Sequence, residues 1–172
     1  DMGYMLDPTF LYVTGRFKSL LISSDGEKYS PEGIEEALVE NSKFISQVVL
    51  HDNQDPYVSL LMVPNKDALV EYVKKEHPGV DPASEEGKTL QLKKIQSEVD
   101  QYRAGGAFAG LFPERWLPAA ICVLPEPFTE QNHMVNSTMK IVRGKVEEAY
   151  KDRLEFAYTV EGKNIVNVQN LA

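Results

Sequence analysis

The sequence is poor in the features that define several large classes of proteins. It contains one cysteine, Cys122, so no disulfide can form within the chain. Cys122 lies in the apolar run 119–124, which favours a small buried side chain and fits a reducing compartment. No apolar run approaches the roughly 20 residues that a helix needs to cross a bilayer. We therefore expect neither a disulfide scaffold nor a transmembrane segment in this chain.

Sequence motifs of several catalytic classes are missing as well. We find no GxxxxGK[ST] phosphate loop and no GxSxG nucleophile turn. The three histidines, His51, His77 and His133, share no metal-ligand spacing, and none has the cysteine nearby. This arrangement favours solvated or core histidines over a zinc site, so we expect no bound metal among them.

The charge of the chain is unevenly distributed. The 172 residues carry 26 acidic and 18 basic side chains, a formal net charge of −8, which argues against a nucleic-acid partner. Two basic clusters stand out against this background: Arg16 with Lys18, and Lys140 with Arg143 and Lys145. The second cluster is either the solvated start of a helix or an anion site, in which a lysine neutralises developing charge.

Residue patterns predict short strands interleaved with helices. Turn residues and β-branched runs predict strands at residues 5–6, 10–13, 20–22, 28–29, 45–52, 57–64 and 119–124. Helical spacing predicts helices at residues 31–42, 66–76, 84–103 and 144–156, and residues 138–142 are expected to be extended. Short strands and tight hairpins favour an α+β domain with a small antiparallel or mixed sheet.

Three stretches, taken in order, resemble one known family. They are DMGYMLDPTFLYVTGRFKSLLI, DGEKYSPEGIEEAL and FTEQNHMVNSTMKIVRGKVEEAY. Their order and spacing are similar to the C-terminal region of the adenylate-forming, or AMP-binding, superfamily, and most similar to AMP-forming long-chain fatty acyl-CoA synthetases. The resemblance covers most of residues 1–158 and implies the C-terminal part of a longer protein.

The resemblance implies roles for individual residues. Asp1 matches the acid that holds the ribose hydroxyls of ATP, and Arg16 matches a basic residue that contacts the nucleotide. Lys18 occupies the hinge position, and Gly26 falls in the hairpin that approaches CoA. Lys140 matches the catalytic lysine that bridges the acyl carboxylate and the α-phosphate while the adenylate forms.

A further basic residue, Arg143, matches the auxiliary position that commonly follows this lysine. The terminal loop departs from the family pattern. Where the family usually has Gly, this chain has His133, and where it has Thr-Pro, this chain has Asn136 and Ser137.

The implied organisation is a hinge approach in residues 1–16, a mobile C-terminal domain in 17–158 and a tail of unknown role in 159–172. The implied activity joins a fatty acid to CoA through acyl-AMP, with ATP, CoA and Mg²⁺ bound mainly by a large domain outside this chain. We expect the chain alone to be inactive. A cytoplasmic location is expected, with a peripheral position at the inner membrane face left open.

Two alternatives to this activity remain open. One is another adenylate-forming ligase, which acts on an acyl carrier protein or an aryl acid. The other is a binding domain that has the same fold without catalysis. The phosphate loop and the acyl pocket, which would separate the ligases, belong to the large domain.

Overall fold

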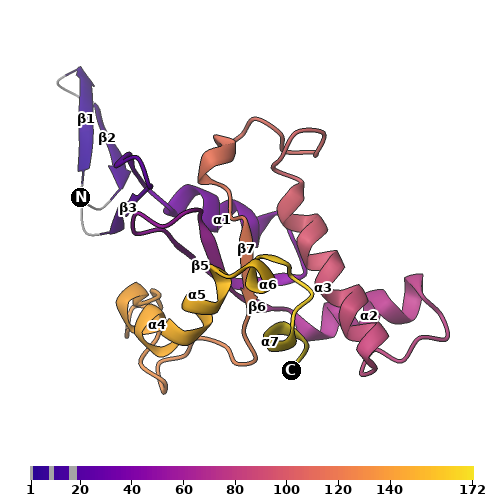
Figure 1. The fold of residues 1–172 in the computed structure, drawn as a ribbon. Coiled ribbons are helices and arrows are strands. Elements are labelled where there is room, and N and C mark those ends of the chain that lie inside the picture. The colour runs from indigo at the N-terminus through magenta and orange to yellow at the C-terminus, as the bar shows by residue number, and fades with distance from the viewer. Residues whose placement is uncertain (1, 8–9, 16–18) are drawn as a thin grey trace.

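The computed structural model describes residues 2–7, 10–15 and 19–172, and a three-stranded mixed sheet lies at its centre (Figure 1). The strands are β5 (Ile45–His51), β6 (Ser59–Pro64) and β7 (Ala120–Val123), in the order β5-β6-β7. β5 pairs antiparallel with β6, and β7 pairs parallel with β6. The predicted α+β class is confirmed, and the sheet is mixed because the chain passes through two helices before it returns as β7.

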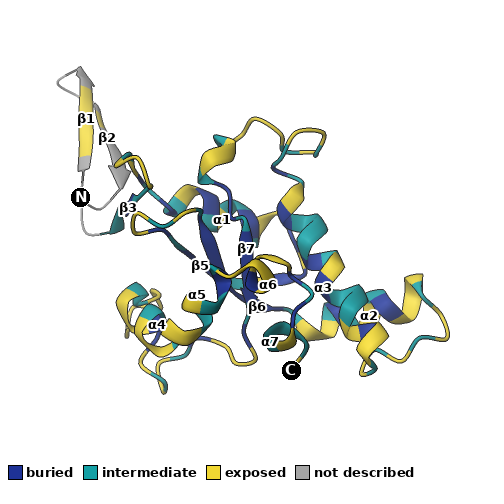
Figure 2. Ribbon diagram, viewed as in Figure 1, coloured by how far each residue is buried: buried dark blue, intermediate teal, exposed yellow. Residues whose placement is uncertain are grey.

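This sheet has apolar side chains on both faces, and a separate layer of helices therefore covers each face. Val48 and Leu50 belong to one buried cluster, and Val49 between them belongs to the other. This alternation is the two-residue period of a strand. Figure 2 shows the resulting dark-blue strands between partly exposed helices.

Two groups of helices supply these two layers. The first cluster contains residues of α1 (Glu32–Glu40), α2 (Lys66–Glu76) and α3 (Glu85–Asp100), and the second contains residues of α4 (Arg143–Ala149) and α5 (Lys151–Ala157). The prediction for α2 is confirmed at both ends. The single helix predicted at 144–156 is wrong, because the chain breaks at Tyr150 between α4 and α5.

Two antiparallel hairpins precede the sheet. β1 (Met2–Asp7) pairs with β2 (Phe10–Gly15), and β3 (Leu21–Ile22) pairs with β4 (Lys28–Tyr29). The β3–β4 hairpin is attached to the β5–β6 connection. The amide of Ile22 donates to the Asp52 carbonyl at 3.2 Å, and the amide of Gln54 donates to the Ile22 carbonyl at 2.7 Å.

The C-terminal segment is part of the packed body. Its two short helices are α6 (Val160–Lys163) and α7 (Val168–Leu171). The Asn170 side chain accepts from the Val123 amide and donates to the Ile121 carbonyl, both at 2.9 Å. These bonds satisfy backbone groups on the outer edge of β7, which would otherwise be open to another strand. The compact body therefore continues beyond the predicted last helix.

In the part of the chain that the structure describes, no helix combines the length and the apolar character needed to cross a bilayer.

Candidate functional site

The loop that presents Lys140 is held in one conformation by an asparagine. The side-chain oxygen of Asn136 accepts the backbone N–H groups of Thr138 and Lys140, each at 3.0 Å. An isolated antiparallel bridge between Val135 and Ile141 closes the loop below them. Of the segment predicted to be extended at 138–142, Ile141 lies in this bridge, whereas Thr138 and Met139 form a tight turn, which an Asn side chain can brace by mimicking a backbone acceptor.

The Lys140 side chain is exposed, and within the part of the chain that the structure describes it forms no ion pair. Lys140 lines a groove of about 630 Å³ together with Glu32, Glu36 and Glu40 of α1. Met139 beside it is 79% exposed and has a φ of 61°. An ammonium in this position is free to meet an anion brought by a substrate.

Arg143 is bound inside the domain, although it lies only three residues further along the chain. Its guanidinium donates to the Leu50 carbonyl at 2.7 Å and to both carboxylate oxygens of Glu35, one of them at 3.0 Å. Its side chain is 23% exposed. Burial raises the pKa of the Glu35 carboxyl, and the charge and hydrogen bond of Arg143 oppose that rise. Arg143 thus joins α4 to α1 and β5.

Gly26 forms the tip of the β3–β4 hairpin. Its φ is 87°, and its amide donates to the Ser23 carbonyl at 2.9 Å. The Asp25 side chain accepts from the Glu27 amide at 3.1 Å. A Cβ added at Gly26 would meet no atom within 4 Å, so the backbone conformation requires glycine here and crowding does not. The tip offers open main chain to an approaching molecule.

The structure brings Lys140 and Arg143 together beside α1 but leaves Gly26 on another surface. The groove next to the Gly26 hairpin, about 280 Å³, is lined by Ser23, Asp25 and Arg115 among others and is separate from the Lys140 groove. Asp1, Arg16 and Lys18 lie outside the described residues.

A polar cluster that the sequence analysis did not single out lies between these two surfaces. His51 at the end of β5 contacts Glu147 of α4 at 2.8 Å and Asp55 at 3.2 Å. Burial disfavours the imidazolium, but the hydrogen bond and charge of Glu147 and the charges of Asp55 and Asp52 outweigh it and raise the pKa of His51. The polar run HDNQD after an apolar strand marks only one half of this cluster.

A tyrosine completes the polar cluster from the side of the β3–β4 hairpin. The Tyr29 hydroxyl donates to the Asp52 carboxylate at 2.8 Å, and burial together with that carboxylate raises the pKa of Tyr29. Glu147 and Tyr29 are far from HDNQD in the sequence, so only the fold could show them together.

Known proteins share both the sequence pattern and the fold. Residues 18–99 match the model of the family described as AMP-binding enzyme C-terminal domain. Long chain acyl-CoA synthetase 8 of Arabidopsis thaliana is 29% identical over 159 residues, which are 92% of this chain and 22% of that protein. The long-chain-fatty-acid–CoA ligase ACSBG1 of Rattus norvegicus is 26% identical over 175 residues, 92% of this chain and 24% of the relative.

A solved structure supports the same fold. The adenylation domain of a carboxylate reductase from Mycobacterium chelonae matches with a TM-score of 0.71 and 24% identity, over 91% of this chain and 22% of that one. This chain therefore spans less than a quarter of the length of the proteins compared. Residues 18–99 are thus similar to the C-terminal domain of AMP-binding enzymes, and the described part of the chain has a fold found in the adenylation domain of this carboxylate reductase.

Proposed function

We propose that the chain is the C-terminal domain of a cytoplasmic long-chain fatty acid–CoA ligase, which forms acyl-AMP from ATP and transfers the acyl group to CoA. The observation that carries the proposal is Lys140, an exposed ammonium on a braced loop at the place where the family motif has its lysine. The names of the two ligase relatives support a fatty acid as the substrate.

Lys140 acts in the first step of this proposal. A carboxylate oxygen of the fatty acid attacks the α-phosphorus of ATP, and the bond to pyrophosphate breaks. The two reactants are both negative, and pyrophosphate leaves with added charge. The Lys140 ammonium stabilises this transition state, and Asn136 fixes the loop that presents it, so little reorganisation is needed.

The Gly26 hairpin acts in the second step. The CoA thiol attacks the acyl carbonyl of acyl-AMP, AMP leaves, and the thiol proton is released to solvent. Gly26 and Lys140 lie on separate surfaces, so the domain must turn between steps to present each of them. We assign the turn to the junction at Lys18 and a nucleotide contact to Arg16 and Asp1. Such alternation is a shift between two closed arrangements.

The moving unit is proposed to be residues 17–158, and the packing of Asn170 on β7 makes residues 159–172 move with it. ATP and CoA would be held mainly by the rest of the ligase. Among the described residues, no group of three or more His, Cys, Asp or Glu side chains could hold a metal ion. We place Mg²⁺ mainly in the large domain of the ligase, together with the ATP phosphates.

The test compares this chain with the intact protein. Pyrophosphate release from ATP plus palmitate and formation of palmitoyl-CoA are measured for both. The intact protein is expected to perform both reactions and the isolated chain neither. Turnover by the isolated chain, or an intact protein that is inactive with fatty acids of every length, would contradict the proposal. Transfer to an acyl carrier protein in place of CoA would correct the acceptor.

A further inference from the structure

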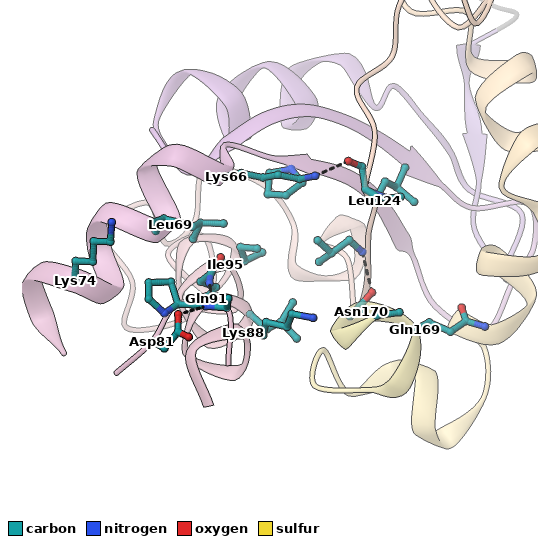
Figure 3. Close-up of a pocket in the computed structure, with 18 of the residues that line it drawn as sticks. Lys66, Leu69, Lys74, Asp81, Lys88, Gln91, Ile95, Leu124, Gln169 and Asn170 are labelled. Carbon is teal, nitrogen blue, oxygen red and sulfur yellow. Dashed lines mark hydrogen bonds between the residues drawn. The ribbon is translucent and has the colours of Figure 1, made fainter. Parts of the chain in front are cut away.

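A second groove of about 630 Å³ lies between α2, α3, the segment after β7 and the C-terminal tail (Figure 3). Gly26 and Lys140, the described residues proposed for the two steps of the ligase reaction, do not line it. Leu69 of α2, Ile95 of α3 and Leu124 after β7 are buried side chains of its wall. The volume lies within the roughly 300–1,000 Å³ typical of small-molecule sites, which are also mainly apolar.

The charge of this groove is opposite to that of the chain. Its lining includes four basic side chains, Lys66, Lys74, Lys88 and Arg153, and one acidic side chain, Asp81. The whole chain has a net charge of −8. Lys66 donates to the Pro125 carbonyl at 2.7 Å and Lys88 donates to the Leu171 carbonyl at 3.0 Å. Each ammonium has three donors, so both can also bind an anion.

Arg153 is a basic side chain of this groove whose hydrogen-bond partners do not compensate its charge. Its guanidinium donates to the carbonyls of Gln169 at 3.0 Å and Val123 at 2.8 Å and to the Asn170 side-chain oxygen at 2.7 Å. All three acceptors are neutral. Its Nε is buried and has no partner in the described part of the chain. A partly buried cation surrounded by neutral groups is costly unless a counter-charge lies near it.

We propose that this groove binds one long-chain carboxylate from solution, with the aliphatic tail against the more exposed apolar lining residues Val70, Pro82 and Pro125. The carboxylate lies toward Lys66, Lys88 and Arg153. A nucleotide fits less well, because the described residues of the lining include no aromatic ring on which a base could stack. The site is additional to the substrate site of the proposed ligase and is independent of any ligase activity.

The experiment is a calorimetric titration of this chain with dodecanoate below its micelle concentration. One saturable site is expected. Lys66→Glu combined with Lys88→Glu is expected to weaken binding about tenfold or more, because two attractions become repulsions. Lys75→Glu combined with Lys93→Glu changes the net charge equally on the same two helices outside the groove. That matched control is expected to bind like the unaltered chain.

A second variant tests the cavity and leaves its charge unaltered. Ala83 is exposed and lines the groove, so Ala83→Trp fills space without entering the core, and it is expected to weaken binding by at least tenfold. Thermal unfolding of every variant checks the fold. Dodecyltrimethylammonium, which has the same tail and the opposite charge, is expected to show no saturable binding.

Several results would overturn this inference. They are the absence of dodecanoate binding, equal binding of the cationic surfactant, equal loss in the control variant, and tighter binding of an acidic amphipathic peptide at the same groove. The last result would make the groove a docking site for a protein segment. Lys140→Ala is expected to leave dodecanoate binding unchanged, so failure of this inference and failure of the proposed ligase activity are distinguishable.

Discussion

The Lys140 loop and the Gly26 hairpin are built alike but present opposite chemistry. In each, a side-chain oxygen accepts from the backbone: Asn136 accepts two N–H groups in the loop, and Asp25 accepts one in the hairpin. Each has a residue with positive φ, Met139 at 61° and Gly26 at 87°. The first turn presents a flexible ammonium, whereas the second presents bare main chain. The same kind of braced turn therefore supports both tips, and the residue at each tip determines which chemical group is presented.

The hairpin and the helix after the Lys140 loop are both held near the end of β5. The hairpin is bonded to the β5–β6 connection through Ile22, Asp52 and Gln54, and α4, which follows the Lys140 loop, is bonded to the last residue of β5 through His51 and Glu147. The expected effects of substitution differ according to whether a residue offers chemistry at a tip or supports this framework.

The largest effect is expected at the tip of the loop. Lys140→Ala in the intact protein should slow acyl-AMP formation by about 10²–10³, roughly 3–4 kcal/mol, because one preorganised charge is lost from the transition state. Thioester formation from supplied acyl-AMP should be retained. Single-turnover assays of the two steps measure this, with Lys145→Ala as the control for a neighbouring exposed lysine. Equal loss in both steps would assign Lys140 a structural or shared role.

Arg143→Met is expected to act on stability. Removal of Arg143 leaves the Glu35 carboxyl mostly buried without its partner, which should lower the free energy of unfolding by about 3 kcal/mol. Urea unfolding of this chain measures the change. Lys145→Met is the control, since Lys145 is exposed and pairs with Glu148 only at 3.7 Å, so it should cost less than about 1 kcal/mol. Similar costs for both would contradict the supporting role of Arg143.

A smaller effect is expected at the tip of the hairpin. Gly26→Ala forces a side chain into positive φ and should cost about 1 kcal/mol in stability. Gly79→Ala is a matched control, because Gly79 has a φ of 98° and also has open space around its Cβ position. Both variants should be destabilised alike, but only Gly26→Ala should slow thioester formation in the intact protein. If the two behaved identically in that assay, the hairpin tip would have no special part in the second step.

The smallest effect concerns the framework between the tips. The pKa of His51 is raised above its ordinary value of 6.5 by Glu147, Asp55 and Asp52 against the effect of burial. The native state therefore holds this proton more tightly than the unfolded state. The stabilisation should be complete below pH 6.5 and should be lost as the pH rises through the raised pKa.

Urea unfolding of this chain at a series of pH values measures the effect of His51. His51→Gln should remove the corresponding part of the decline in stability, by about 1 kcal/mol or less, the usual scale of one hydrogen bond. His77 lies at the end of α2, outside this cluster. His77→Gln should therefore leave the decline in stability with rising pH unchanged. An unchanged pH profile in His51→Gln would show that the cluster does not hold the proton.

Much of the local structure could be predicted because it depends on neighbours in the sequence. Helix α2 has Asn65 as its cap and Leu69 and Val73 at helical spacing, so its bounds were correct. The prediction of one helix at 144–156 was wrong. The apolar spacing continues across the break at Tyr150, so the sequence pattern did not reveal that break. The turn at residues 138–139 was also missed, since the bonds of Asn136 are not visible in a pattern of apolar residues.

The sequence by itself determined the α+β class and the positions of most strands, because these depend on residue periodicity and spacing, and the order of its motifs carries the family resemblance. The tertiary structure decided which basic residues are available. Lys140 and Arg143 are three positions apart and chemically similar, but only Arg143 meets Glu35 and Leu50. The tertiary structure also places the Arg153 side chain of α5 within hydrogen-bonding distance of Val123, Gln169 and Asn170. Such contacts join residues far apart in the chain, so their energies depend on how the helices pack against the sheet.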